Sequence, residues 1–402
     1  MTGSSQQEPR QGINWSNPAS LVRDERFWKV AGQILVIVLV VSVVAILTDN
    51  LLYNLDQKGI PLDFDFLNSQ ASFDIGETLI PYSPSDSYGW AILVGLLNSL
   101  RVMVLGIVLA TMVGLGVGIA RLSDNWLVRN LALVYVETFR NVPLLVQLFF
   151  WYFAFFVPLP AIDKRITLLG SVLVANQGIA LPWFVATAGT GIWLGLLALG
   201  VLAAAWLWRW RTRLMVEEGR AEKPVLWGLG AIALSALIAL VVTQTAPFFL
   251  SVPQVANNTQ FQGGLVISSE FGTLLLGLTI YTASFIAEIV RGGIQSVPKG
   301  QIEAAQALGL KPGRIMQMVI LPQALRVIIP PLTSQYLNLW KNSSLAVAVG
   351  YADIYSVSST TFNQTGRVLQ VMLLIAFTYL TISLTISLLM NLYNQTVQLK
   401  ER

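Results

Sequence analysis

Long apolar runs alternate with short polar stretches along this chain, and this alternation is the dominant pattern of the sequence. Several runs reach about 18 residues, which is long enough for a helix to cross a hydrocarbon core of about 30 Å. The pattern predicts an all-α polytopic membrane protein with about eight spans. We place these spans near 30–47, 91–120, 131–157, 190–208, 225–246, 267–290, 327–349 and 368–390.

Two stretches depart from the pattern. The region 160–189 holds shorter apolar pieces, because Pro160, Gly170, Gly178 and Pro182 interrupt it, and we expect a re-entrant or surface element there. The polar residues 1–29 are too long for a signal peptide, and the following apolar run has no small-residue cleavage site. We therefore expect a retained first span.

The distribution of Lys and Arg predicts the orientation, because cytoplasmic loops carry an excess of these residues. With the N-terminus inside, the inner segments hold 18 of the 25 Lys and Arg residues, the outer segments hold four, and three fall within spans. The outer loop 48–90 is acidic instead. Both termini are therefore expected in the cytoplasm, and the net charge of +4 requires no nucleic-acid partner.

Composition limits the chemistry. The chain is 54% hydrophobic and 11% charged, and it contains neither Cys nor His. Disulfides, thiol nucleophiles, His-based metal sites and imidazole acid–base catalysis are therefore excluded. Scattered carboxylates remain, but a membrane-embedded enzyme would need a cluster of acid–base or metal-ligand residues. We therefore expect no catalytic residue, no metal ligand and no bound cofactor in this chain, and a protein that is not an enzyme.

The stretch EAAQALGLKPGR, residues 303–314, is polar although it lies between two apolar runs. Ile302, Ala305 and Leu308 share one helical face, Gly309 suits a helix end, and Pro312 prevents continuation of the helix. A second short helix is expected in RIMQMVIL, after which Pro322 turns the chain toward the next span. The orientation places this helix pair on the cytoplasmic side, where pattern alone is equally compatible with an interfacial amphipathic turn.

The spacing of this stretch resembles the EAA loop of ATP-binding-cassette importer permeases. Glu303, Ala304 and Ala305 are followed by Gly309 and then, after nine residues, by VILP, which ends in Leu321 and Pro322. In that family the loop docks into a cleft of the cytoplasmic ATPase subunit. The resemblance therefore implies an ATPase-coupling role for Glu303, Ala304, Ala305, Gly309, Leu321 and Pro322.

Longer stretches resemble the polar amino acid permeases, in particular the broad-range or glutamate-glutamine type. They are NSLRVMVLGIVLATMVGLGVGIARLS, VYVETFRNVPLLVQLFFWYF, YTASFIAEIVRGGIQSVPKGQ and PQALRVIIPPLTSQYLNLWKNSSLAVAVGY. The resemblance implies a five-helix type I permease core in two parts, 91–157 and 267–393, with the EAA loop at 295–322. Three additions surround this core: the first span with its acidic outer loop (30–90), an insertion with about two spans (158–266) and cytoplasmic ends (1–29 and 394–402).

Polar residues inside spans are candidates for the substrate pathway, because a charge within the membrane is costly. Lys341 is followed by Asn342, Ser343 and Ser344, and could meet the carboxylate of an amino acid; alternatively, it pairs or snorkels while the serines bond to their own helix. For Glu288 we favour an ion pair with Arg291 over contact with a substrate amino group. Arg140 lies in a polar notch with Glu137 and Asn141 beside Pro143, which we expect to kink the helix.

Gly114 and Gly118 have the spacing of a GxxxG motif, with Gly116 between them. This motif permits close packing of helices, and we expect packing within the chain rather than between subunits.

The resemblance also implies partners. They are a cytoplasmic ATPase dimer, which binds ATP and Mg, a periplasmic amino-acid-binding protein, a second permease subunit in a heterodimer or a homodimer, and a polar L-amino acid as substrate, all at a bacterial inner membrane. The chain itself contains no Gly-Lys dipeptide and hence no Walker A motif. An ion-coupled secondary transporter is the alternative, although no internal repeat supports it.

Overall fold

The computed structural model describes residues 25–59, 62–219, 223–257 and 259–397. The chain divides into two compact units, residues 1–65 and 66–402. The first unit contains helix α2 (Glu25–Gln57), which is apolar on all sides and whose side chains from Trp28 onward are almost all exposed within the chain. A helix that is hydrophobic all round suits a lipid environment.

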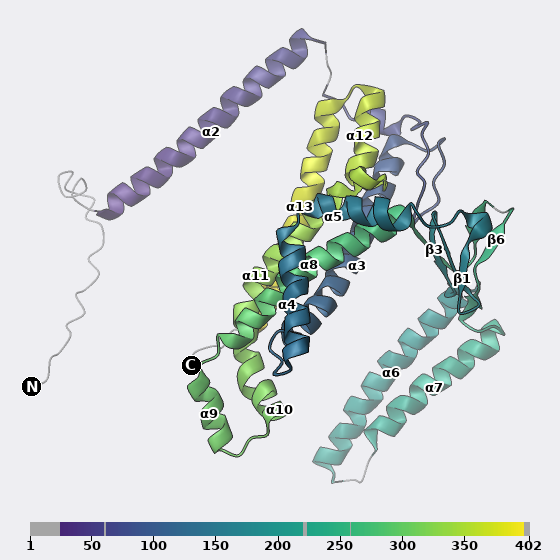
Figure 1. The fold of residues 1–402 in the computed structure, drawn as a ribbon, viewed down its shortest axis with the longest axis vertical. Helices are drawn as coiled ribbons and strands as arrows, with labels where there is room; N and C mark the ends of the chain where they lie inside the picture. Colours follow the sequence, from purple (N-terminus) through teal and green to yellow (C-terminus); the bar gives the residue numbers. More distant parts are fainter. Residues whose placement is uncertain (1–24, 60–61, 220–222, 258, 398–402) are drawn as a thin grey trace, which may run out of the picture. The chain divides into compact units, whose positions relative to one another are not determined.

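The second unit is built on a bundle of long helices (Figure 1). Helix α3 (Tyr88–Ala120) packs along α8 (Ser269–Gln295), and α8 packs on α11 (Leu321–Asn342). Helix α13 (Val368–Val397) covers α11, and the shorter α12 (Ile354–Thr365) packs on α3 and α13. The largest side chains of this core include Trp340, Leu339 and Ile286, all almost fully buried.

The crossing of α3 and α8 depends on two glycines. A Cβ atom at Gly114 would lie 2.6 Å from Ile286 Cβ, and one at Gly118 would lie 2.8 Å from the carbonyl oxygen of Ala287. The two backbones approach so closely only because these positions carry no side chain. The predicted GxxxG contact within the chain is confirmed.

The span that contains Pro143 is broken. Helix α4 (Trp126–Asn141) ends just before this proline, and α5 (Leu144–Phe149) begins just after it and continues as the π-helical turn η2 (Phe150–Phe156). The two parts are bent by 106°. A proline lacks the N–H that would continue the helix and restricts the preceding residue, which explains the position of the break.

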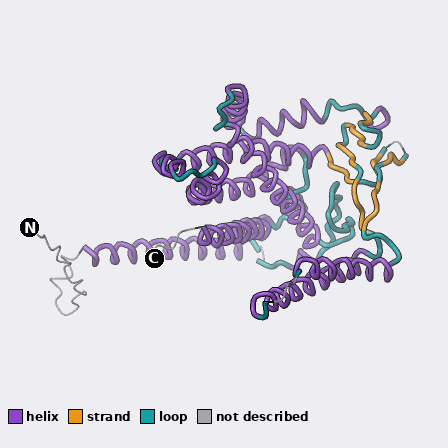
Figure 2. The backbone as a smooth tube through the Cα atoms, turned by 90° about the horizontal axis from the view of Figure 1, so that it is seen from below, coloured by secondary structure: helices purple, strands orange, loops and turns teal. Residues whose placement is uncertain are grey.

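The region 160–189 forms short strands rather than a membrane-inserted helix. After the 3-10 turn η3 (Ile162–Lys164) come β1 (Ile166–Leu168), β2 (Val172–Ala175) and β3 (Gly178–Leu181), which form an antiparallel sheet with β8 (Leu265–Ser268) in the order β1-β2-β3-β8. Two further strand pairs lie beside it, as the orange segments of Figure 2 show. They are β4 (Trp183–Ala186) with β5 (Phe248–Ser251), and β6 (Gln254–Ala256) with β7 (Gln260–Gln262).

Between β4 and β5 the chain forms an antiparallel helical hairpin. It consists of α6 (Thr190–Glu217) and α7 (Pro224–Thr243), which pack closely along their length. Gly200 permits this approach, because a Cβ atom there would lie 2.1 Å from the hydroxyl of Ser235. These helices correspond to the two spans predicted inside the insertion.

The remaining elements are short. Turn η1 (Asp65–Asn68) precedes α3, and the 3-10 helix η5 (Ser343–Val349) continues α11. Between α8 and α11 lie α9 (Lys299–Ala307), α10 (Pro312–Ile315) and the π-helical turn η4 (Met316–Ile320).

Within the described ranges, seven helices are long and apolar enough to cross a membrane, and the bent pair makes up to eight. This result confirms the predicted helical membrane fold, with seven of the eight predicted spans as single candidate helices and the span near 131–157 as the bent pair. The expected turn at Pro322 is wrong, because α10, η4 and α11 run on without a break and Pro322 lies in the first turn of α11. The π-helical turn η4 lies just before Pro322, and such a turn changes the hydrogen-bond pattern at the place where proline has no N–H to donate.

Candidate functional site

The amphipathic stretch forms the predicted pair of short helices. Helix α9 follows Pro298 and ends at Ala307, Leu308 is its C-cap, and Gly309 then adopts a left-handed conformation with φ +74°. The N–H of Gly309 donates to Gln306 O at 2.8 Å, and the N–H of Leu310 donates to Ala305 O at 3.2 Å. A glycine at this position closes the helix without a steric penalty.

One face of α9 packs against the chain itself. Ala305 is 5% exposed and joins a cluster with Ile315, Ile320 and Ala324, and Ile302 packs against this cluster. Ala305 therefore holds the helix pair together and does not lie on an outer face. The prediction that Leu308 shares this face is wrong, because Leu308 follows the last residue of α9 and is 81% exposed.

The outer face of the helix pair mixes charged and apolar groups. Glu303, Ala304 and Gly309 are exposed, Leu321 is 41% exposed, and Pro322 is partly buried. Met318 of the π-helical turn is 65% exposed. Exposed apolar side chains and an exposed carboxylate therefore occur together in this short segment, a composition that suits recognition by another protein.

Glu288 lies in an ion-pair cluster that joins two helices. Its carboxylate accepts from Arg121 Nη1 at 2.8 Å and from Arg291 Nε at 3.0 Å. Arg121 follows α3, and the other two residues belong to α8. The predicted pair with Arg291 is confirmed, and Arg121 adds a link that only the three-dimensional structure reveals. Because both arginines pair with the Glu288 carboxylate, a structural role for Glu288 is favoured over contact with a substrate.

Arg140 lies at the end of α4, and its guanidinium is 5.2 Å from the ring centroid of Phe285 on α8. Its neighbour Asn141 donates to Glu137 O at 2.8 Å. The structure therefore brings Arg140 near the α8 face that carries Glu288, one turn further along.

Lys341 is exposed near the end of α11. The serine after Asn342 is fully buried, and Ser343 Oγ donates to Trp340 O at 2.7 Å, while Ser344 Oγ donates to Lys341 O at 2.9 Å. Both hydroxyls therefore bond to their own helix, as in the alternative interpretation of this stretch. Lys341 is therefore the exposed group of this stretch, and Asn342 beside it is partly buried.

A polar cavity of about 280 Å³, which the sequence did not predict, lies at the start of α8. Glu77, Ser268, Glu270 and Tyr351 contribute to its walls. The carboxylate of Glu77 pairs with Arg101 of α3 and accepts from Ser268 Oγ at 2.6 Å. Loop 48–90, which we expected only to surround the core, therefore contributes a charged group to this cavity. The one sequence feature that pointed to this cavity was Arg101, a charged residue inside an apolar span.

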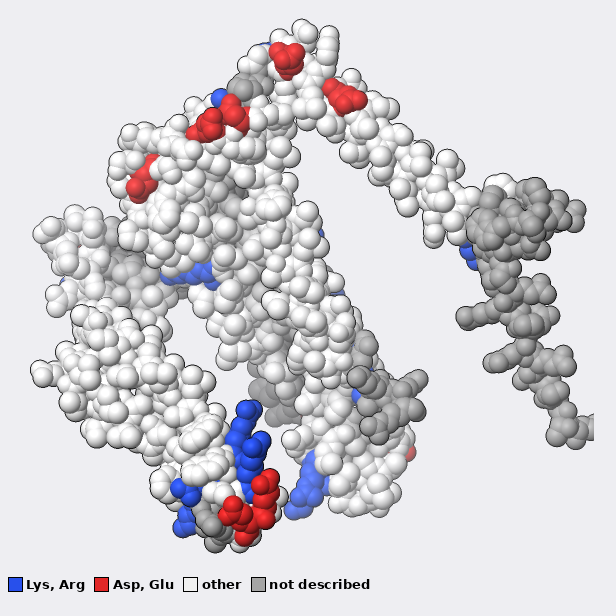
Figure 3. Space-filling view, turned by 180° about the vertical axis from the view of Figure 1, so that it is seen from behind, with Lys and Arg blue, Asp and Glu red and all other residues white. Residues whose placement is uncertain are grey.

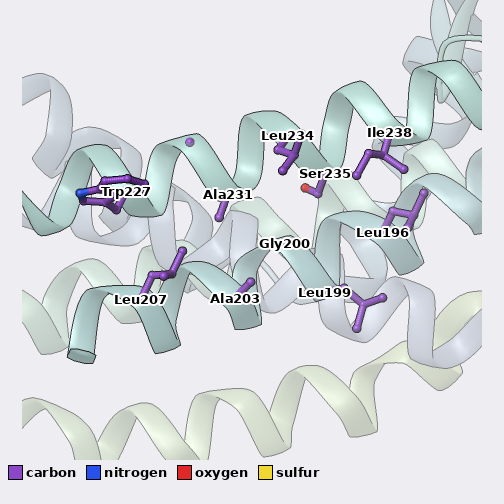
Figure 4. Close-up of a pocket in the computed structure, with 11 residues that line it drawn as sticks. Leu196, Leu199, Gly200, Ala203, Leu207, Trp227, Ala231, Leu234, Ser235 and Ile238 are labelled. Carbon is purple, nitrogen blue, oxygen red and sulfur yellow. The ribbon is translucent and has the colours of Figure 1, made fainter. Parts of the chain in front are cut away.

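A larger cavity of about 600 Å³ lies in the α6–α7 hairpin and is almost wholly apolar (Figure 4). Leucines from both helices line it, and Ser235 is its polar group. Such a groove suits packing against lipid or protein and offers no acid, base or nucleophile. Among the described residues, no cluster of acidic side chains could hold a metal ion.

The fold and the site thus define a polytopic membrane protein with an exposed helix pair between two spans. Comparison with known proteins agrees. The family of binding-protein-dependent transport system inner membrane components matches residues 224–399. The general L-amino acid transport system permease protein AapQ of Rhizobium johnstonii is 42% identical over 395 residues, covering 98% of each chain.

A second relative is the glutamate/glutamine/aspartate/asparagine transport system permease protein BztB of Rhodobacter capsulatus, which is 44% identical and covers 98% of each chain. A solved structure described as an amino acid ABC transporter with histidines is 20% identical, with a TM-score of 0.45 over 77% of this chain and 95% of that chain. The chain belongs to the permease family of binding-protein-dependent ABC importers, as the sequence resemblance predicted. It is a transport subunit and not an enzyme.

Proposed function

We propose that this chain forms half of the translocation pathway of an ATP-driven importer of polar L-amino acids. Relatives that align over almost the whole chain are permease proteins of systems named for general amino acids and for glutamate, glutamine, aspartate and asparagine. The exposed outer face of the α9–α10 pair supports coupling to a separate ATPase. This face lies outside the apolar part of the spans and is suited to recognition by another protein.

The proposed partners follow from this role. A separate ATPase dimer binds ATP and Mg and receives the helix pair, a periplasmic binding protein delivers the amino acid, and a second permease subunit completes the pathway, with a heterodimer favoured. We further propose that both termini and the helix pair lie in the cytoplasm of a bacterial cell, with the protein in the inner membrane. The excess of Lys and Arg in the corresponding loops supports this orientation.

The coupling proposal has a matched test, because the chain contains no Cys and two adjacent alanines of α9 differ in exposure. Ala304 is exposed, whereas Ala305 is 5% exposed. Ala304→Cys should form a disulfide with a Cys placed in the ATPase cleft under mild oxidation, and Ala305→Cys should not. Bridged Cα atoms lie roughly 4.4–6.8 Å apart, so chance neighbours seldom qualify.

Glu303→Lys provides a functional readout of the same face. It inverts an exposed charge and should lower amino acid uptake in proteoliposomes of the whole complex while the ATPase retains its own activity. If Ala304→Cys never cross-links at any cleft position and Glu303→Lys transports normally, the helix pair is an interfacial turn and the coupling proposal fails.

For the substrate pathway we propose Lys341 as the principal contact, with Asn342 beside it. An ammonium group that faces outward within an apolar span is suited to the carboxylate of an amino acid. Ser343, Ser344, Glu288 and Arg140 then act mainly as supports, because the first three are engaged in contacts within the chain. Lys341→Met should lower uptake severalfold without loss of the assembled complex, and Lys341→Arg should restore part of it. Normal kinetics in Lys341→Met would exclude the pathway role.

A further inference from the structure

One face of helix α6 changes from apolar to basic along its length. Residues 201, 204, 205, 208, 209, 212 and 213 recur at intervals of three and four, so they lie along one side of the helix. The first four are Val, Ala, Ala and Trp, and the last three are Arg, Thr and Arg. This stripe crosses the boundary between the apolar part of α6 and its charged end.

The stripe lines two cavities that adjoin. An apolar groove of about 310 Å³ runs between α6 and α7 and includes Val201, Ala204, Gly228 and Ile232. A hollow of about 550 Å³ with two arginines in its wall, the basic cavity, follows on α6 and is lined by Ala205, Trp208, Arg209, Thr212 and Arg213. Ala205 and Trp208 belong to both, so the groove leads directly into the basic cavity.

The polar groups of this cavity favour an anion. Arg209 and Arg213 are exposed, and Thr212 Oγ1 is buried without a hydrogen-bond partner among the described residues. Arg211 lies apart from them, with its guanidinium 4.4 Å from the ring centroid of Trp227. The nearest acidic groups along the helix, Glu217 and Glu218, lie beyond this cavity at the end of α6. Figure 3 shows basic and acidic side chains together at this end of the hairpin.

The two cavities together match an amphipathic molecule with a negatively charged head. We propose that the α6–α7 hairpin binds a phospholipid with an anionic head group, whose acyl chain lies in the apolar groove and whose phosphate lies between Arg209 and Arg213. Clusters of arginine at the end of a membrane helix attract anionic head groups, and both arginines here belong to α6. A free phosphate would leave the groove empty, and a zwitterionic lipid lacks the net charge that two arginines favour.

The proposal can be tested on the full chain in lipid bilayers. A fluorophore on Val201→Cys reports from the groove, because Val201 is exposed in its wall and the chain has no other Cys. Phosphatidylglycerol with brominated acyl chains should quench it more strongly than brominated phosphatidylcholine at equal mole fraction. Each arginine contributes about fivefold near an anionic head group, so Arg209→Gln with Arg213→Gln should reduce the relative affinity for the anionic lipid tenfold or more.

Arg129→Gln is the matched control, since it removes an exposed arginine from α4, outside the hairpin. Ala205→Trp fills the junction of the two cavities at an exposed position and should also abolish the preference. Equal quenching by both lipids in the unchanged chain would overturn the proposal. An equal effect of Arg129→Gln would also overturn it, because surface charge alone would then explain the preference. Displacement of the lipid by inorganic phosphate at constant ionic strength would likewise overturn it, because the site would then bind a free ion.

Discussion

Gly118 offers the sharpest test of how the core is held together. A Cβ atom there would lie 2.8 Å from Ala287 O and 2.8 Å from Val290 Cβ, whereas ordinary van der Waals contacts of such atoms begin at about 3.4 Å. The obstructing oxygen belongs to the backbone of α8, so it cannot rotate away and the two helices must separate. Overpacking by a few methylene groups costs about 1–3 kcal/mol, and Gly118→Leu should therefore cost about 3 kcal/mol or more.

Gly116 is the matched control two residues away on the same helix. A Cβ atom at Gly116 meets nothing within 4 Å, so Gly116→Leu should keep the fold and gain up to about 1 kcal/mol from helix propensity. The two variants should therefore differ by about 4 kcal/mol, measured as the free energy of unfolding of the detergent-solubilised chain in denaturant. Equal stability of the two variants would refute the close crossing of α3 and α8. Loss of a partner subunit from Gly118→Leu without a change in unfolding would instead place this motif at a subunit interface.

Two further predictions concern carboxylates. Glu288→Gln leaves Arg121 and Arg291 without their shared charged partner and should lower the free energy of unfolding by about 2 kcal/mol. A double-mutant cycle with Arg121→Gln should show clear coupling. Loss of uptake at unchanged stability would contradict this structural role. Burial raises the pKa of Asp353, which caps α12, from 3.8 to about 7. The folded state then binds the proton more tightly than the unfolded state, so stability should fall by up to roughly 1.4 kcal/mol per pH unit as pH rises from about 4 to about 7. Asp353→Asn should flatten this dependence, and an unchanged pH profile would show that another group titrates.

The spans could be predicted because a membrane imposes a simple rule on each of them. A run of apolar residues such as 368–390 needs no distant partner to become a helix, since its backbone groups bond within the segment. The break at Pro143 was predictable for the same local reason. The short strands were not, because β1 to β8 contain only three or four residues each, and their pairing depends on register between residues far apart in the sequence.

The candidate site was predictable in position and less so in orientation. The motif located the helix pair, but the side that Ala305 faces depends on Ile315, Ile320 and Ala324, which follow after a turn. The spacing of apolar residues in a helix of nine residues does not specify whether its apolar face meets the chain itself or a partner. The cavity at Glu77 was missed because its carboxylate meets Arg101 and Ser268 only in the folded chain.

The pairing of β4 with β5 makes the inserted helices a detachable module. Ala186 and Phe248 are direct partners in the antiparallel register, so the hairpin leaves and re-enters the protein through adjacent positions of one ribbon. A two-residue turn of the Asn-Gly type could therefore join them and delete α6 and α7 together. The sheet that leads into α8 would keep its strands, because β3 and β8 pair outside the excised segment. Chimeric permeases could exchange this hairpin between relatives at the same two positions, which would separate what the module does from what the bundle does.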